Sequence, residues 1–156
     1  MSCLVTVIRH ANERLSKCTL TPLHGREEIT FLTAKGDMRF DATGFILLAV
    51  GAPVLSEADA GRPLLVLDST WHLLPKIMRR IDGNPILRSL PLGVRTAYPR
   101  VSKVFPDPDG GLASVEALYL ARKILGDDDV SLLDAYRWRE AFLAGLTASA
   151  LDPLCR

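Results

Sequence analysis

The sequence predicts an α/β domain built on a mainly parallel sheet, and two observations support this prediction. The apolar runs at 44–50 and 63–68 have the length of strands and lack polar alternation, which is typical of strands covered on both faces. Helical segments alternate with such runs along the chain, as they do in parallel sheets. Because 48% of the 156 residues are hydrophobic, there is enough apolar material for one core, and we expect a single domain over residues 1–156.

Other strands are predicted from shorter patterns. The β-branched run at 3–8 and the run at 29–33 each predict a strand, and 90–99 predicts a strand that runs into a loop. Between the first two runs, the polar stretch 9–27 predicts a long surface loop, and long ordered loops tend to carry function.

Four segments are predicted to be helical: about one turn at 56–59, then 75–81, 112–125 and 131–146. Pro75 is acceptable in the first turn of its helix, because its missing amide hydrogen would have no partner there. Gly126 ends the third segment, and Ser131 is expected to be the N-cap of the fourth.

The net charge of +1 hides a basic middle segment. Between residues 71 and 104 seven positive side chains stand against one acid, Asp82, whereas the chain beyond 105 turns acidic. A basic segment of this kind is expected of a localised phosphate-binding face. An ordinary solvated surface, or a face for an acidic protein partner, produces the same composition.

Composition argues against several classes of protein. Cys3, Cys18 and Cys155 form no CxxC pair, and the three histidines have no metal-ligand spacing, so we expect no metal. No signal peptide and no apolar stretch of membrane-spanning length is visible in the sequence, so a soluble, cytoplasmic protein is expected.

Three predicted loops are candidates for a binding site. Ligands of parallel α/β sheets bind beyond the carboxyl ends of the strands. Asp68 lies at such an end, as do the residues after Val50 and those around Thr96, so these loops are expected to form one crevice. The alternative for Asp68 is a purely local role as a helix N-cap or in an Asx-turn.

Several short strings resemble one enzyme superfamily. Asp68-Ser69-Thr70-Trp71 resembles the signature of the DTW-domain tRNA enzymes. Other strings resemble the archaeal and eukaryotic small-subunit rRNA aminocarboxypropyltransferases, in the same order along the chain: Lys17-Cys18-Thr19, Leu55-Ser56-Glu57-Ala58-Asp59, Leu90-Pro91, Thr96-Ala97-Tyr98-Pro99 and Leu112-Ala113-Ser114-Val115-Glu116-Ala117. The resemblance covers about 5–143. It departs from the family's pattern at Leu20, where the family has glycine, and at Glu57, where it has proline.

The resemblance implies a SPOUT-like fold, in which helices flank a parallel sheet with a trefoil knot at the cofactor site. It divides the chain into a small N-terminal β portion, 1–43, and a knotted cofactor-binding portion, 44–146. The activity it implies is transfer of the 3-amino-3-carboxypropyl (acp) group of S-adenosylmethionine to a nitrogen of uridine or pseudouridine. The partner would be rRNA or tRNA, which would place the enzyme in rRNA or tRNA processing and ribosome biogenesis. The enzyme would be a monomer or a homodimer. Alternatives are a SPOUT-type RNA methyltransferase and a non-catalytic RNA-binding or ribosome-assembly module.

Individual roles follow from the resemblance. Asp68 would hold the ammonium of the acp group or help to remove the ring proton, and Trp71 would cover the cofactor arm, although a lone tryptophan is more often a core residue. Thr19 would meet the acp carboxylate, or be a turn residue only. The other cofactor contacts come from three strand ends and a helix start: Leu48, Ala49, Val50, Leu67, Leu92, Thr96, Ala97, Leu112 and Ser114.

A second group of residues is expected to bind RNA phosphates. Lys76, Arg79 and Arg80 are spaced i, i+3 and i+4, which places them on one helical face. The remaining basic side chains of the expected track come from other predicted loops and strand ends: Arg9, Arg14, Lys17, Arg95, Arg100 and Lys103. Affinity for RNA through such contacts falls as salt rises.

Overall fold

A five-stranded parallel sheet forms the centre of the computed structural model, which describes residues 3–11, 19–49, 51–69, 71–91, 93–94, 96–97 and 112–148. The strand order is β2-β1-β5-β4-β7. The strands are β1 (Val5–His10), β2 (Ile29–Ala34), β4 (Ile46–Leu48), β5 (Leu64–Asp68) and β7 (Ile86–Arg88). A separate parallel pair joins β3 (Phe40–Asp41) to β6 (Ile81–Asp82). The predicted parallel sheet is therefore confirmed.

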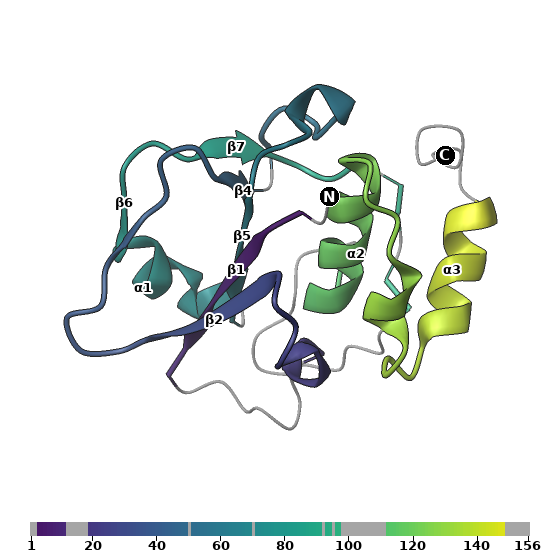
Figure 1. The fold of residues 1–156 in the computed structure, drawn as a ribbon, viewed down its shortest axis with the longest axis horizontal. Helices are drawn as coiled ribbons and strands as arrows, with labels where there is room; N and C mark the ends of the chain where they lie inside the picture. The colour runs from purple at the N-terminus through teal and green to yellow at the C-terminus, as the bar shows by residue number, and fades with distance from the viewer. Residues whose placement is uncertain are drawn as a thin grey trace.

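Helices cover both faces of the sheet. α2 (Ser114–Ile124) lies on one face with α3 (Arg139–Ala148) outside it, and α1 (Leu74–Met78) lies on the other face (Figure 1). Because successive residues of a strand point to opposite faces, β1 serves two cores. Val5 and Val7 belong to the larger core under α2, and Ile8 belongs to the smaller core under α1.

Short 3₁₀ helices occupy several connections: η2 (Thr21–Leu23), η3 (Glu57–Asp59), η4 (Trp71–Leu73) and η5 (Val130–Leu133). The one-turn helix expected at 56–59 is thus confirmed, and its Asp59 carboxylate accepts from the Ser56 amide at 3.2 Å, which satisfies the backbone just before the helix. The helix predicted at 112–125 is confirmed as α2, and Gly126 follows it with φ of +95°, as expected of a residue just beyond a helix end. Among the described helices, none is long and apolar enough to cross a membrane.

Three predicted elements are wrong in detail. The helix expected at 75–81 ends at Met78, because Ile81 pairs with Phe40 in the small sheet. The strand expected at 90–99 is replaced by β7, which pairs with β4 earlier in the chain, and the described residues from 90 to 97 form no strand. The helix expected at 131–146 is split into η5 and α3, and its predicted N-cap is also wrong, because Asp129 Oδ1 accepts from the Ser131 amide at 3.1 Å.

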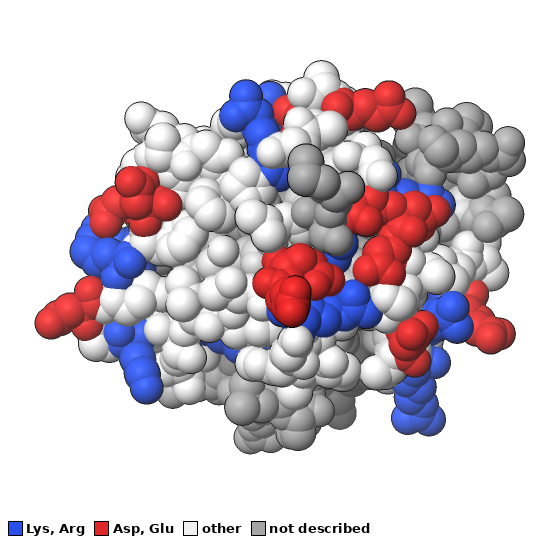
Figure 2. All heavy atoms as spheres, in the orientation of Figure 1, with Lys and Arg blue, Asp and Glu red and all other residues white. Residues whose placement is uncertain are grey.

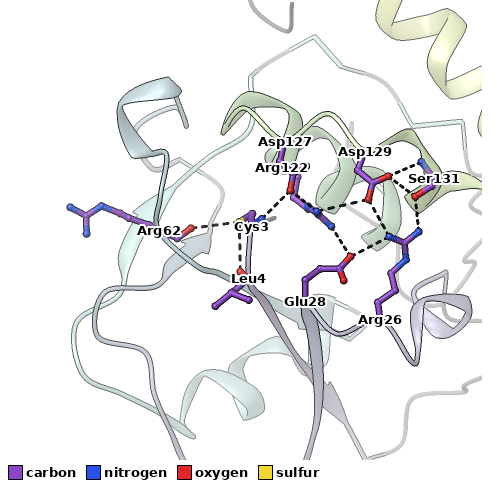
Figure 3. Close-up of polar contacts among 9 residues, drawn as sticks. All are labelled: Cys3, Leu4, Arg26, Glu28, Arg62, Arg122, Asp127, Asp129 and Ser131. Atoms are coloured by element: carbon purple, nitrogen blue, oxygen red, sulfur yellow. Dashed lines mark hydrogen bonds and ion pairs between the residues drawn. The ribbon is translucent and has the colours of Figure 1, made fainter. Parts of the chain in front are cut away.

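A partly buried ion-pair network joins the amino ends of the first strands to the far end of α2 (Figure 3). We call it the Arg122 network, and its members are Arg26, Glu28, Arg122, Asp127 and Asp129. Arg122 is only 1% exposed and pairs with Asp127 and, at 3.5 Å, with Glu28. Arg26 bridges Glu28 at 3.2 Å and Asp129 at 3.1 Å. This network therefore fastens α2 to the sheet at the edge opposite the carboxyl ends of the strands.

The carboxylates of the Arg122 network are more acidic than usual. Burial alone would raise the pKa of Asp127, but hydrogen bonds from Arg122 and the Cys3 amide hold it below its ordinary value. Burial is also the largest effect on Glu28, and hydrogen bonds from its own backbone and Arg26 again lower the pKa. For Asp129 the hydrogen bond from the Ser131 hydroxyl is the main cause of a lowered pKa.

Candidate functional site

A buried ion pair lies at the carboxyl ends of two neighbouring strands. Arg9 of β1 and Asp68 of β5 are partners in the parallel register, and each residue is 4% exposed. Arg9 Nε donates to Asp68 Oδ2 at 3.1 Å. Both side chains follow residues of the larger core at a spacing of two, Val7 and Val66, so they lie on the α2 face of the sheet. The strand of Asp68 can end on a buried charge because the adjacent strand supplies the opposite one.

Arg9 is not a surface residue, and the expectation that it contacts RNA phosphates is wrong. Its Nη1 lies 2.9 Å from His24 Nε2, and its Nη2 donates to Thr21 Oγ1 at 3.2 Å. The guanidinium carbon lies 4.6 Å from the centre of the Phe31 ring, on which the His24 ring stacks at 3.8 Å. These contacts direct the arginine inward, toward the site, because its partners lie on the sheet and on the segment after residue 19.

The first turn of α2 meets two of the predicted site residues. Ser114 Oγ donates to Asp68 Oδ1 at 3.0 Å, and the Val115 amide donates to Thr19 Oγ1 at 3.1 Å. The first amides of a helix have no partner within the helix, so the threonine hydroxyl satisfies one of them. Thr19, Asp68 and Ser114, which are far apart in sequence, are thereby brought to one place.

Glu116 attaches a third segment to the same turn, and sequence reasoning missed it. Its side chain is fully buried and accepts from Thr96 Oγ1 at 2.6 Å and from the Ala97 amide at 2.8 Å. It also accepts from the Ala113 amide at 2.8 Å, which satisfies the backbone just before the helix. The available signal was its position, because an acid three residues into a helix is the usual partner of the preceding backbone.

Other predicted cofactor contacts have mixed outcomes. Leu48 and Leu112 pack against the larger core, on the α2 face, and the Ala49 amide donates to Arg88 O at 2.8 Å. Leu67 packs against the smaller core, so its side chain lies on the face away from α2, and a side-chain contact with a ligand beside Asp68 is not supported.

Some predicted site residues lie outside the part of the chain that the structure describes. Trp71 begins η4 just after Asp68, but its side chain is outside the description. The others fall in five undescribed segments or positions: Arg14, Lys17, Val50, Leu92, Arg95, Arg100 and Lys103.

A basic hollow of about 510 Å³ lies on the opposite face of the sheet, under α1. It is lined by His10, Ala34, Gly36, Asp37, Met38, Arg39, Lys76, Arg79 and Arg80. Since His10 directly follows Arg9 in β1, the hollow and the Asp68 site lie at the same strand end on opposite faces. The three predicted RNA-binding residues of the α1 region thus line one concavity.

The basic side chains of this hollow differ in how they are held. Lys76 and Arg79 are exposed, and their side chains have no hydrogen bond or ion pair within the described ranges. Arg80 Nη1 donates to the carbonyls of Gly36 at 2.7 Å and Met38 at 3.2 Å, so part of its fork stabilises the loop after β2. On the face drawn in Figure 2, positive and negative side chains of the described residues are intermixed.

No metal site emerges from the described residues, where no group of three His, Cys, Asp or Glu side chains could hold an ion. The polar groups of the Asp68 site are instead its carboxylate, hydroxyls and backbone amides. Such a set suits an organic ligand that carries both an ammonium and a carboxylate, because each charge meets a complementary donor or acceptor.

Comparison with known proteins gives one structural likeness. No protein-family model and no curated protein matches the chain. Among solved structures, the chain is similar to the SAM-dependent rRNA:acp-transferase Tsr3 from Vulcanisaeta distributa, with a TM-score of 0.75 and 22% sequence identity. The match covers 99% of this chain and 84% of that one. The likeness shows that the two chains share a fold across nearly the whole of this protein.

Proposed function

We propose that this protein is an S-adenosylmethionine-dependent aminocarboxypropyltransferase that modifies a uridine or pseudouridine of RNA. The observation that carries the proposal is the meeting of three segments at the start of α2: Thr19, Asp68 and the pair Thr96–Ala97. The shared fold supports it, because the similar structure is that of a SAM-dependent rRNA:acp-transferase. On this basis rRNA is the preferred substrate class, and the DTW-like string at Asp68 leaves tRNA as the alternative.

The residues present fit the donor. When bound, S-adenosylmethionine supplies an activated C–S bond: a ring nitrogen of the base takes the γ-carbon, methylthioadenosine leaves, and the ring proton is released. Asp68 would hold the ammonium of the amino-acid arm. A carboxylate can accept about four hydrogen bonds, so the contacts with Arg9 and Ser114 are compatible with this role. The Thr19 hydroxyl would lie beside the arm's carboxylate.

Most of the catalysis then consists of positioning. Because the leaving group is already activated, a protein that holds the γ-carbon in line with the ring nitrogen gains most of the available rate. Leu48, Ala49, Thr96 and Ala97 would surround the adenosine, and Trp71 would cover the arm. A strong general base is unnecessary in this scheme.

The basic hollow would bind the RNA backbone. Lys76 and Arg79 are exposed cations of that concavity, and one strand end separates it from the Asp68 site. An RNA strand whose phosphates lie in the hollow could pass over this edge of the sheet and place an unstacked base beside Asp68. RNA is usually modified on bases that are splayed out in this way.

We also propose that the fold is SPOUT-like, with the trefoil knot within 44–146. The parallel sheet and the order β1-β5-β4-β7, which is not sequential, are consistent with such a topology. The proposed knot would bring the loops that follow β4, β5 and β7 around one cofactor.

Two measurements on the purified protein test the function. Calorimetry should detect S-adenosylmethionine binding by the wild type and a large loss in Asp68→Asn. Asp127→Asn is the matched control, because Asp127 is also paired with an arginine but lies at the opposite edge of the sheet. Mass spectrometry of RNA incubated with enzyme and donor should then show one uridine heavier by an aminocarboxypropyl group. A gain of one methyl group would instead identify a methyltransferase, and binding of RNA without modification would identify a non-catalytic module.

A further inference from the structure

We propose that Arg9 is a positioning residue of the cofactor site, which balances the charge of Asp68 and fixes the orientation of its carboxylate. This inference rests on the proposed function, because it concerns the amino-acid arm of the same donor. It assigns to Arg9 a role that differs from RNA binding and that depends on its burial.

Two neighbouring side chains fix the orientation of the Asp68 carboxylate. The Asp68 carboxylate is held from two sides, by Arg9 Nε at Oδ2 (3.1 Å) and by Ser114 Oγ at Oδ1 (3.0 Å). One partner is on the adjacent strand β1 and the other on α2, so rotation of the carboxylate would break one contact or the other. The plane in which Asp68 can receive a ligand's ammonium is therefore set by Arg9 and Ser114 together.

The buried charge of Asp68 requires a positive partner. A carboxylate that is 4% exposed is costly without a positive partner, and Arg9 supplies one in direct contact with it. A guanidinium has no acceptor, so Arg9 Nη1 is the donor in its hydrogen bond with His24 Nε2. Arg9 thus offsets the charge of Asp68 before any ligand binds, as is appropriate for an arm whose own ammonium and carboxylate sum to zero.

Arg9 also contacts the segment that follows Thr19. Arg9 Nη2 donates to Thr21 Oγ1 at 3.2 Å, and Thr21 lies two residues beyond Thr19. One guanidinium therefore contacts Asp68, Thr21 and His24 through separate nitrogens, and its plane packs near Phe31. Lysine, with a single nitrogen at the end of a flexible stem, cannot reproduce this fork. Arg9 links the two sides of the site that we assign to the arm.

A pair of ligands separates a positioning role from a merely structural one. S-adenosylhomocysteine retains the amino-acid arm, whereas methylthioadenosine lacks it. By calorimetry, Arg9→Met should lower the affinity for S-adenosylhomocysteine at least about tenfold and leave the affinity for methylthioadenosine within about twofold of the wild type. Arg9→Lys should lie between, because it restores the charge without the fork. Arg26→Met is the matched control, since it removes an ion-paired arginine at the opposite edge of the sheet, and it should change neither affinity.

Two outcomes would overturn the inference: equal weakening of both ligands by Arg9→Met, or no weakening of either. Failure of the proposed function is distinguishable, because the wild type itself would then bind neither ligand. If Arg9→Met does not fold, the double variant Arg9→Met/Asp68→Asn removes both charges and should recover folding. In it, S-adenosylhomocysteine should bind no more tightly than methylthioadenosine, and a retained preference for the arm would contradict the proposal.

Discussion

Replacing Glu116 by alanine should loosen the cofactor site and destabilise the protein together. The fully buried carboxylate holds the Ala97 amide and the Thr96 hydroxyl against the start of α2, and it also satisfies the Ala113 amide. Glu116→Ala leaves two backbone donors without their acceptor. An unsatisfied buried donor costs about 1–3 kcal/mol, so the loss amounts to about 2–6 kcal/mol. Relief of the carboxylate's own desolvation offsets part of it, and we expect about 2–4 kcal/mol.

The assay combines urea unfolding with ligand binding. The free energy of unfolding should fall by the amount above without a change in the urea dependence. Methylthioadenosine should bind more weakly, because the 96–97 segment is expected to contact the adenosine. Glu116→Gln is the matched control: it keeps the size of the side chain and one acceptor oxygen, but places an amide donor against a backbone donor, so an intermediate loss is expected. A Glu116→Ala protein within about 0.5 kcal/mol of the wild type and with unchanged affinity would refute this reasoning.

Three further predictions concern other parts of the molecule. The carboxylates of the Arg122 network have lowered pKa values, so they stabilise the fold above their ordinary pKa values, near about pH 4, and this stabilisation is lost as the pH falls through the lower folded values. In Asp127→Asn the free energy of unfolding should therefore depend less steeply on pH in the acid range. An unchanged pH profile would count against the network. Gly83→Ala should cost about 1–3 kcal/mol in urea unfolding, since φ is +79° and a Cβ would collide with the Thr43 hydroxyl; a neutral effect would show that this turn relaxes. The double variant Lys76→Glu/Arg79→Glu should weaken RNA binding and reduce its salt dependence without changing the affinity for S-adenosylhomocysteine. Unaltered RNA affinity would exclude the basic hollow as the site that binds the RNA backbone.

The sheet could be predicted from the sequence because its signal is local. Continuous apolar runs at 44–50 and 63–68 require cover on both faces, and α1 and α2 provide it. The place of Asp68 was predictable for the same reason, since a buried strand that ends on a charge marks the carboxyl edge.

The partners of Asp68 were not predictable, because they depend on strand order. Arg9 resembles any basic residue at the start of a polar stretch until β1 is placed beside β5, which brings it to an aspartate 59 positions away. Glu116 is similar: its position in the first turn is visible in the sequence, but its bonds to Thr96 and Ala97 exist only in the folded chain.

The split of the last predicted helix has a tertiary cause. The apolar spacing of 131–146 fits one helix, but Asp129 caps η5, and Ser131 Oγ receives a hydrogen bond from Arg26 at 2.7 Å. Ser131 is therefore held against the segment that precedes β2, and the chain turns again before α3 begins at Arg139. Periodicity alone does not show such a break, since both pieces remain amphipathic.

The most direct test of the central claim identifies the small-molecule product of the reaction. Purified protein is incubated with S-adenosylmethionine and total RNA from a strain that lacks the gene, and the released nucleoside is separated by liquid chromatography. Transfer of the acp group predicts methylthioadenosine, formed only when RNA is present and lost in Asp68→Asn. Release of S-adenosylhomocysteine, or of no nucleoside while the donor binds, would contradict the account.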